Sequence, residues 1–255
     1  MKAIILAAGY ATRLYPLTEN FPKPLLDVGG QTILDHLVDQ LKTIPDIDHA
    51  YLVTNHRFHN FFTNWARQRQ THKRHGQQAH TGLRFDILDD GTTSNDDRLG
   101  AVGDIQFAIE QRNITDDIIV LAADNILQFP LQKFVTAFKT KSASWVCVRR
   151  ISDPEDRKRR GIAQLDAQNR IIDFEEKPQQ PKSEWGVPPF YIYPSRVLPH
   201  IKTYLTSGGT TDAPGHFLVY LHKQEPVYAH KITGEILDIG NHESLAEARK
   251  FFERK

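Results

Sequence analysis

The sequence predicts an α/β protein with a Rossmann-like three-layer fold and a mixed, mostly parallel central sheet. Two observations carry this prediction. Short apolar runs alternate with amphipathic helical segments over residues 1–150, and the apolar runs stop at polar or small residues. The chain has 255 residues, of which 40% are hydrophobic and 25% charged, so it is long enough to bury a sizeable core without covalent cross-links.

The expected elements follow from the hydrophobic spacing. Apolar runs predict strands at residues 2–6, 50–53, 83–88, 117–123 and 144–148. Apolar residues at helical spacing predict helices at residues 32–44, 58–70, 100–111 and 130–139. After residue 150 the spacing changes, and antiparallel strands are expected at 161–165, 170–175 and 190–193. Helices are expected at 195–205, 214–223 and 242–252.

Charge and cysteine content exclude several classes of protein. Lys and Arg number 32 against 31 Asp and Glu, and a net charge of +1 argues against a nucleic-acid or anionic-membrane partner. The single cysteine, Cys147, excludes an internal disulfide, and its apolar setting favours a packed thiol over a nucleophile. No apolar run approaches the length of about 18 residues that a membrane span needs. The N-terminal run is too short for a secretion signal, so a cytoplasmic location is expected.

Domain organisation is expected to be simple. No change of composition is sharp enough to mark a linker, and no internal repeat is present, so residues 1–255 are expected to form a single domain with an insertion-like second half. Three histidines, at positions 72, 75 and 80, lie in a polar run that is more typical of a solvated loop than of a metal site.

A loop after the first strand is the most specific feature. The strand ends in small residues, Ala8 and Gly9, which let backbone N–H groups approach a ligand closely, and Thr12 adds a hydroxyl. Arg13 and Lys23 on the same loop would supply two cations to a polyphosphate. Neither standard phosphate-binding fingerprint is present. From spacing alone, a surface loop with solvated charges is an equally good interpretation.

The same loop resembles the signature of the sugar-1-phosphate nucleotidyltransferases, or nucleotide-sugar pyrophosphorylases, which reads LAAG-x-G-T-R-L-x-P-L-T followed by P-K-P-L-L. The similarity extends to glucose-1-phosphate thymidylyltransferase-like and mannose-1-phosphate guanylyltransferase-like members. It implies that the loop holds a nucleotide, with Arg13 and Lys23 against the phosphates. Ala11 stands where the family has a second glycine, and alanine adopts a positive φ less readily.

Two aspartates match the metal-binding positions of the family. Asp124 follows an apolar strand, and Asp238 lies in Leu237-Asp238-Ile239-Gly240-Asn241, which resembles the family segment D-x-G-N. The resemblance implies that both carboxylates bind Mg²⁺, a hard cation that prefers oxygen. Without the resemblance, both residues would be interpreted as turn or helix-cap residues.

The second half carries the sugar-side motif of the family. Glu175-Glu176-Lys177-Pro178 resembles E-E-K-P, which implies that Glu176 faces sugar hydroxyls and Lys177 the sugar phosphate. Gly161 matches the glycine of a sugar-side strand, and Gly100 matches a helix start near the nucleotide. Taken alone, the E-E-K-P match is also typical of an exposed strand end with alternating charges.

The resemblance implies an Mg²⁺-dependent in-line transfer from an NTP to a sugar 1-phosphate, giving an NDP-sugar and pyrophosphate. Its catalytic cations are Arg13, Lys23 and Lys177. The first hypothesis is dTTP or UTP with glucose 1-phosphate; GTP with mannose or heptose 1-phosphate is the alternative. A non-catalytic nucleotide-binding regulatory subunit and transfer to a phosphate such as phosphocholine remain open.

The resemblance also implies a division of the chain. Residues 1–150 are then the nucleotide-binding half and residues 151–255 the sugar-phosphate half, without a C-terminal β-helix. Regulation is expected from contacts in a homo-oligomer or from the core itself.

Several positions depart from the family pattern and leave the base and the sugar open. Asp89 or Asp90 stands where relatives place a base-reading Gln, and Pro189 replaces a sugar-side glycine. Ala101 and Val102 replace the usual Thr and Ala of the helix start. The segment 212–215, Asp-Ala-Pro-Gly, occurs in some members of the family and receives no role from the sequence.

Overall fold

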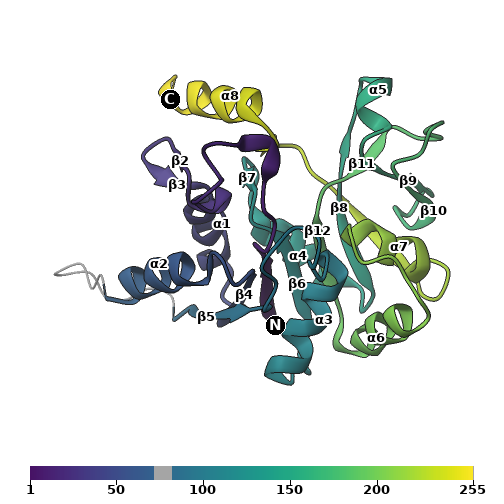
Figure 1. Cartoon of the computed structure of the whole chain (residues 1–255). Coiled ribbons are helices and arrows are strands. Elements are labelled where there is room, and N and C mark those ends of the chain that lie inside the picture. The colour runs from purple at the N-terminus through teal and green to yellow at the C-terminus, as the bar shows by residue number, and fades with distance from the viewer. Residues whose placement is uncertain (72–81, 255) are drawn as a thin grey trace. The chain divides into compact units, whose positions relative to one another are not determined.

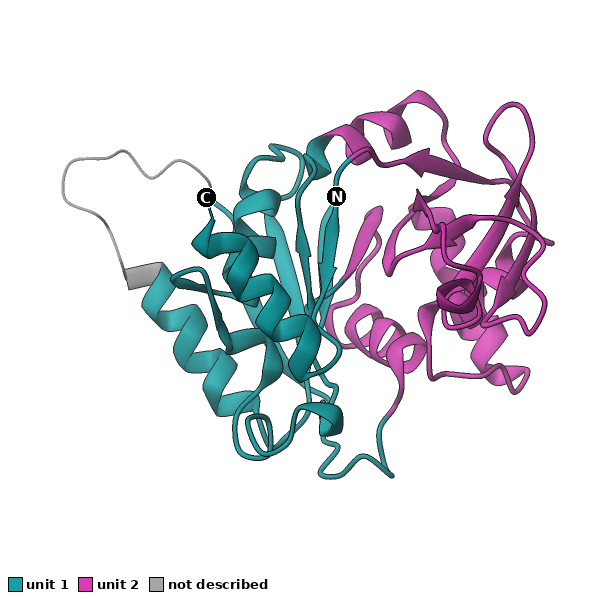
Figure 2. Ribbon diagram, turned by 90° about the horizontal axis from the view of Figure 1, so that it is seen from above, with its two compact units in different colours: residues 1–98, 122–132, 234–255 teal, residues 99–121, 133–233 magenta. Residues whose placement is uncertain are grey.

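A computed structural model describes residues 1–71 and 82–254, and Figure 1 labels the elements along the chain. The histidines at 72, 75 and 80 lie outside the described residues. The contacts divide the chain into two compact units, which Figure 2 colours separately. Unit 1 comprises residues 1–98, 122–132 and 234–255, and unit 2 comprises residues 99–121 and 133–233. The chain therefore leaves unit 1 and returns to it twice.

Unit 1 is built on a parallel sheet. Its strands are β1 (Lys2–Leu6), β4 (His49–Thr54) and β5 (Arg84–Asp89). Leu6 pairs with Val53, and Val53 pairs with Leu88, so the carboxyl ends of the three strands lie together. All residues of β4 after His49 are buried, which explains why these strands are apolar runs rather than alternating patterns.

Short elements and helices complete unit 1. The short elements are η1 (Thr12–Leu14), η2 (Lys23–Leu25), β2 (Asp27–Val28), β3 (Gln31–Thr32), β7 (Asn125–Leu127) and β14 (Ile236–Asp238). The helices are α1 (Ile33–Lys42), α2 (His59–Thr71) and α8 (His242–Glu253). Capping boxes begin two of them: Thr32 and Asp35 exchange hydrogen bonds at α1, and Asn241 and Ser244 do so at α8.

A buried carboxylate joins two helices of unit 1. Asp35, which is 3% exposed, accepts a hydrogen bond of 2.7 Å from Trp65 Nε1 and forms an ion pair with Arg69. A buried charge is tolerated only when it is paired and hydrogen-bonded. Asp35 meets both conditions and links α1 to α2.

Unit 2 adds the antiparallel strands that the sequence predicts after residue 150. Its strands are β6 (Ile118–Ala122), β8 (Ser144–Arg150), β9 (Gly161–Leu165), β10 (Ile171–Glu176), β11 (Trp185–Val187), β12 (Phe190–Tyr193) and β13 (Val227–Lys231). β12 runs antiparallel to both β6 and β8, β11 bridges β8 and β9, and β10 pairs with β9. β13 pairs with β8 in parallel.

The helical elements of unit 2 are α3 (Ala101–Arg112), most of α4 (Leu131–Thr140), α5 (Pro154–Arg157), η3 (Ser195–Val197), α6 (Leu198–Thr206) and α7 (Pro214–Leu221). Aromatic rings pack β12 against α7 and α6. Tyr193 contacts Phe217 edge-on at 5.5 Å between ring centroids, and Phe217 contacts Tyr204 at 5.6 Å.

The predicted α/β class with a mixed sheet is confirmed. Sequence reasoning missed β2, β3, β7, β11, β13 and β14. Of these, β7, β11 and β14 have three residues each, too few for a period to be seen.

Cys147 is fully buried, and burial raises the pKa of its thiol well above the usual value, as expected for a packed thiol. Within residues 1–71 and 82–254, no helix combines the length and apolar character of a membrane span.

Gly100 is required by the backbone at the start of α3. Its φ of 78° and ψ of 162° fall in a region open essentially to glycine alone, and a Cβ there would lie 2.6 Å from the carbonyl oxygen of Thr211. We expect Gly100→Ala to lower the free energy of unfolding by about 2–4 kcal/mol, measured by urea denaturation. Gly30→Ala is the matched control, because Gly30 has a φ of 83° but open space around it, so only about 1 kcal/mol is expected. Equal losses in the two variants would contradict the clash with Thr211.

Candidate functional site

Strand pairing in unit 1 brings the two predicted metal-binding aspartates to neighbouring strand ends. β7 and β14 run antiparallel, with Asp238 opposite Asn125, and the N–H of Ile239 donates to the carbonyl of Asp124 at 3.1 Å. The N–H of Ala123 donates to the carbonyl of Leu6, which places Asp124 beside the carboxyl end of β1. This edge of a parallel α/β sheet is where such folds bind ligands.

Lys23 reaches this position from the loop after β1. Its ammonium donates to Asp124 Oδ2 at 2.8 Å and to the carbonyl oxygen of Ile239 at 2.9 Å. The Lys23 side chain is 13% exposed, against 34% for Asp124. The other carboxylate oxygen, Asp124 Oδ1, accepts from Asn125 Nδ2 at 2.6 Å. Lys23 and Asp124, predicted separately as a phosphate ligand and a metal ligand, therefore contact each other directly.

Arg13 and Asp238 flank Gly240 on the same unit. A Cβ on Gly240 would lie 3.9 Å from Arg13 Nη1 and 4.0 Å from Asp238 Oδ1. Arg13 and Asp238 are both exposed. Four predicted residues, two cations and two carboxylates, thus gather around the segment 238–240.

The loop predicted to bind the nucleotide has the small residues and the open space that let a ligand approach its backbone closely. Ala8 is 7% exposed and its carbonyl accepts from Asn55 Nδ2 at 2.9 Å, whereas Gly9 has open space where a Cβ would be. Ala11 adopts φ 49° and ψ 42°, the left-handed conformation that the glycine of the family would take at no cost. Its carbonyl accepts from Thr18 Oγ1 at 2.8 Å, which helps to hold that conformation. Thr12 is exposed at the first position of η1.

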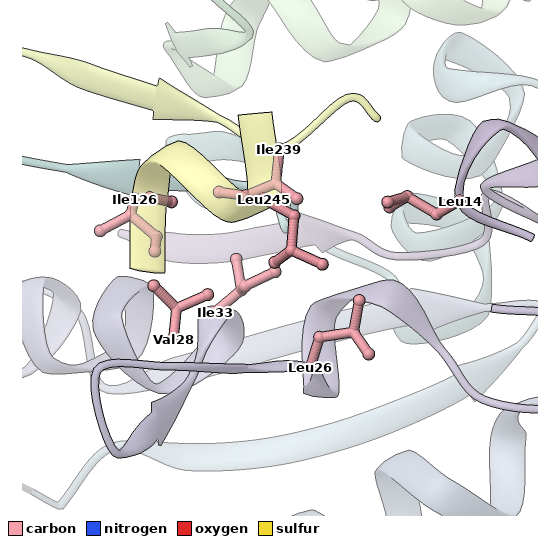
Figure 3. Close-up of a cluster of buried hydrophobic side chains, with 8 residues drawn as sticks. Leu14, Leu26, Val28, Ile33, Ile126, Ile239 and Leu245 are labelled. Carbon is pink, nitrogen blue, oxygen red and sulfur yellow. The ribbon is translucent and has the colours of Figure 1, made fainter. Parts of the chain in front are cut away.

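A buried apolar cluster lies beneath these segments. Figure 3 shows its members converging from the loop, α1, β7, the segment after β14, and α8. The fully buried or nearly buried members are Leu14, Leu26, Val28, Ile33, Ile126, Ile239, Leu245 and Ala248. Arg13 precedes Leu14, and Asp238 precedes Ile239, so the charged residues sit on chain segments that this cluster anchors.

In unit 2, Glu176 is held between two glycines. A Cβ on Gly161 would lie 2.9 Å from Glu176 Oε2, and a Cβ on Gly215 would overlap the same oxygen. Burial raises the pKa of Glu176; nearby Lys177 opposes this shift and Asp212 adds to it. Lys177 is exposed and adopts a positive φ of 49°. Strained backbone of this kind is concentrated at functional positions.

The start of α3 is already hydrogen-bonded inside unit 2. The N–H groups of Ala101 and Val102 donate to the carbonyls of Asp212 and Thr211 at 3.3 and 3.0 Å. The two residues that follow Gly100, a predicted nucleotide-binding residue, therefore hold the start of α3 against the segment 211–212. The Asp-Ala-Pro-Gly segment, which received no role from the sequence, thus contacts the start of α3 and also the Glu176 carboxylate.

The two aspartates at the base-reading position differ in their surroundings. Asp89 ends β5 and contacts His56 Nδ1 at 2.7 Å. Asp90 is more deeply set: its Oδ1 accepts from both the N–H and the hydroxyl of Thr92, and burial raises its pKa. Its Oδ2 is buried without a hydrogen-bond partner among the described residues. Of the two aspartates, Asp90 is thus the one with a carboxylate oxygen, Oδ2, that accepts no hydrogen bond from the described residues.

Sequence reasoning missed Asn125 and Gly215. Asn125 is 2% exposed and holds the Asp124 carboxylate, and Gly215 leaves room for Glu176. Asn125 follows Asp124 directly, so an amide next to a candidate metal ligand was an available signal. Gly215 belongs to the Asp-Ala-Pro-Gly segment, but its sequence gives no sign of its role, because Glu176 lies 39 residues earlier on β10.

Chemically, unit 1 presents cations and carboxylates suited to a polyphosphate with a hard cation, and unit 2 presents a carboxylate and an ammonium on consecutive residues. Within the described ranges, no three His, Cys, Asp or Glu side chains form a metal-binding group.

An α/β fold with these two sets of residues defines a protein of the nucleotide-transferring class. The model of the Nucleotidyl transferase family matches residues 2–255, and the chain belongs to this family. Family membership confirms the recognition made from the loop and strand-end motifs.

Two curated relatives agree with this assignment. The chain is 30% identical over 259 aligned positions to the bifunctional protein GlmU of Methanocaldococcus jannaschii, covering 98% of this chain and 54% of the relative. It is 27% identical to GlmU of Methanococcus aeolicus, covering 97% of this chain and 53% of that protein. The chain thus spans about half the length of the curated relatives it matches.

Solved structures give the same fold. A putative glucose-1-phosphate thymidylyltransferase from Bacillus anthracis, crystallised with sucrose, has a TM-score of 0.76 and 26% identity, covering 100% of this chain and 96% of that one. UDP-glucose pyrophosphorylase complexed with UDP-glucose has a TM-score of 0.78 at 18% identity, with 100% and 99% covered. At that identity the second likeness concerns the fold alone.

The raised pKa of Glu176 predicts a pH-dependent stability difference. A buried carboxyl is better tolerated neutral, so its ionisation lowers the stability of the wild type as pH rises through the raised pKa. We expect Glu176→Gln, which stays neutral, to gain free energy of unfolding relative to wild type between about pH 4 and about pH 7. Urea denaturation at both pH values measures this.

Glu243→Gln, which removes an exposed carboxylate of α8, controls for the loss of one acidic group. A difference between Glu176→Gln and wild type that is constant with pH, or that shrinks as pH rises, would show that burial does not govern this carboxyl.

Proposed function

We propose that this chain transfers a nucleotidyl group from an NTP to a sugar 1-phosphate, releasing pyrophosphate and forming an NDP-sugar. The observation that carries the proposal is the Lys23–Asp124 contact beside Asp238, on a unit whose loop matches the nucleotide-binding signature of the family. The two side chains are 101 residues apart in the sequence and meet at 2.8 Å, with the Lys23 side chain only 13% exposed.

The proposed reaction needs cations and positioning more than proton transfer. An oxygen of the sugar phosphate, already anionic near neutral pH, attacks the α-phosphorus. The bond from that phosphorus to the bridging oxygen breaks, and pyrophosphate leaves with the electron pair. No general base is required, so the residues act by holding polyanions and stabilising developing charge. Arg13 and Lys23 hold the triphosphate in this proposal, with Ala8, Gly9 and Thr12 near the nucleotide.

Unit 2 supplies the acceptor side of the proposal. Lys177 binds the sugar phosphate, Glu176 accepts hydrogen bonds from sugar hydroxyls, and Gly161 keeps the space beside Glu176 open. The support is local: Gly161 and Gly215 both lack the Cβ that would crowd the Glu176 carboxylate, and Lys177 is exposed on a strained backbone.

The residues of unit 1 fit a magnesium ion. Asp124 and Asp238 offer hard carboxylate oxygens from paired strands, and Asp124 already binds a cation, the Lys23 ammonium. We propose that these two carboxylates hold Mg²⁺, which would supply charge neutralisation for the phosphates. Asn125 keeps the Asp124 carboxylate oriented by its hydrogen bond to Oδ1.

The proposed substrates are dTTP or UTP with glucose 1-phosphate. The Bacillus anthracis structure named as a putative glucose-1-phosphate thymidylyltransferase, 26% identical over the whole chain, supports this pair. GTP with mannose or heptose 1-phosphate is the alternative within the same reaction.

The test is pyrophosphate release with Mg²⁺, measured for ATP, CTP, GTP, UTP and dTTP. Each is combined with glucose 1-phosphate, N-acetylglucosamine 1-phosphate and mannose 1-phosphate. Release with one NTP and one sugar phosphate well above the others is the expected result. Arg13→Ala is the negative control, expected to lose on the order of 10²-fold in turnover because it removes a preorganised cation.

Silence across the panel, with nucleotide binding retained in a calorimeter, would replace the enzyme by a nucleotide-binding subunit of the same fold. Phosphocholine is tested as a further acceptor, and release with it but with no sugar phosphate would move the acceptor to another class of phosphate.

Gly215 gives a sharper test of the acceptor side. A side chain at position 215 would displace the Glu176 carboxylate, which can swing because it is the end of a flexible chain. We expect Gly215→Ala to raise KM for the sugar phosphate about tenfold or more while leaving KM for the NTP unchanged. Initial-rate kinetics with each substrate varied in turn separates the two constants. A rise in both would show that Glu176 does not act specifically on the sugar phosphate.

A further inference from the structure

The Asp124 carboxylate has both oxygens engaged by this chain's own side chains. Oδ2 receives the Lys23 ammonium at 2.8 Å, and Oδ1 receives the Asn125 amide at 2.6 Å. A carboxylate oxygen that already holds an ammonium cannot coordinate a divalent cation in the same direction. Access of a metal to the side of Asp124 Oδ2 that faces Lys23 therefore requires the ammonium to move, because two like charges that close together repel each other.

Lys23 is held in place by more than one contact. Its ammonium also donates to the carbonyl oxygen of Ile239, the residue after Asp238, so one side chain joins both aspartate-bearing segments. Leu25, two residues on, ends η2, and Leu26 belongs to the buried apolar cluster, so the backbone that carries Lys23 is anchored. A flexible four-carbon stem on an anchored backbone can swing without unfolding anything.

We propose that Lys23 is a latch on the metal position: it occupies Asp124 in the free protein and is drawn to the phosphates when a nucleoside triphosphate binds. Without the nucleotide, a metal must displace the ammonium itself and therefore binds more weakly. Only the identity of the group that draws Lys23 away rests on the proposed function. The competition between an ammonium and a divalent cation for Asp124 follows from the contacts alone.

By occupying Asp124, Lys23 lowers the apparent affinity of the site for a metal by a measurable amount. When a site is competent only in the fraction of molecules with Lys23 displaced, the apparent affinity falls by that fraction. Removing the ammonium should therefore raise the affinity for a metal probe in the absence of any nucleotide. Loss of positive charge alone also favours a cation, so the experiment needs a variant that removes charge without opening the latch.

Mn²⁺ binding to the nucleotide-free protein, followed by electron paramagnetic resonance, is the first measurement. Lys23→Met is expected to bind Mn²⁺ about tenfold more tightly than wild type. Arg13→Met removes an equal charge beside Asp238 without touching Asp124, and is expected to gain clearly less. Lys2→Met, which removes a surface lysine paired with Asp48, is expected to leave the affinity unchanged.

Adding Asp124→Asn to Lys23→Met should remove the gain. Equal gains in Lys23→Met and Arg13→Met, or no gain in either, would overturn the latch. Far-ultraviolet circular dichroism of each variant establishes that it is folded.

The second measurement uses the wild-type chain and does not depend on any variant. Lysine acylation read by mass spectrometry reports how available each ammonium is. Mg²⁺ at millimolar concentration should increase labelling of Lys23 while leaving Lys2 unchanged, because the metal displaces the ammonium from Asp124. Unchanged or reduced labelling of Lys23 would overturn the proposal. Neither measurement involves turnover, so a silent pyrophosphate panel and a failed latch are distinguishable results.

Discussion

The charged residues of unit 1 depend on one hydrophobic constraint, the buried cluster beneath them. Leu14 and Leu26 come from the loop after β1, Ile126 from β7, and Ile239 from the segment after β14. Each of these apolar residues lies within two or three positions of a charged one: Arg13, Lys23, Asp124 and Asp238. Burial of the apolar members stabilises their segments and so fixes the backbone positions of the charged neighbours. Electrostatic attraction alone, between partly exposed groups, would not fix them.

Strained backbone marks a motif residue in each unit. Ala11 and Lys177 are non-glycine residues with φ of 49°, and both stand in motifs that match the family. Such conformations persist only where surrounding contacts outweigh their cost. For Ala11 the Thr18 hydroxyl contributes, and for Lys177 the hydrogen bond from its own N–H to the carbonyl of Arg160 does. The chain therefore keeps a glycine-like backbone at position 11 without the glycine.

Hydrophobic spacing predicted the long elements well, since β1, β9 and β12 have the bounds read from apolar runs. The site was predicted only as separate residues. Lys23 and Asp124 are 101 residues apart, and nothing in their local sequence says that they meet. Their meeting depends on β7 and β14, two three-residue strands that carry no period. Gly215, in the Asp-Ala-Pro-Gly segment, received no role for a similar reason: its role exists only against Glu176, which lies on β10 and is distant in sequence.

The order in which the ribosome makes the chain affects how the two units fold. Lys23 bonds to Ile239, 216 residues later, whereas all of unit 2 lies between residues 99 and 233. A ribosome therefore delivers every residue of unit 2 before it delivers the strand and helix that complete unit 1. During that interval the apolar side chains that await Ile239 and Leu245 are without their final partners. Closure of so long a loop is slow, and exposed apolar surface invites aggregation. Chaperone dependence during translation should accordingly concentrate on the N-terminal 98 residues rather than on unit 2.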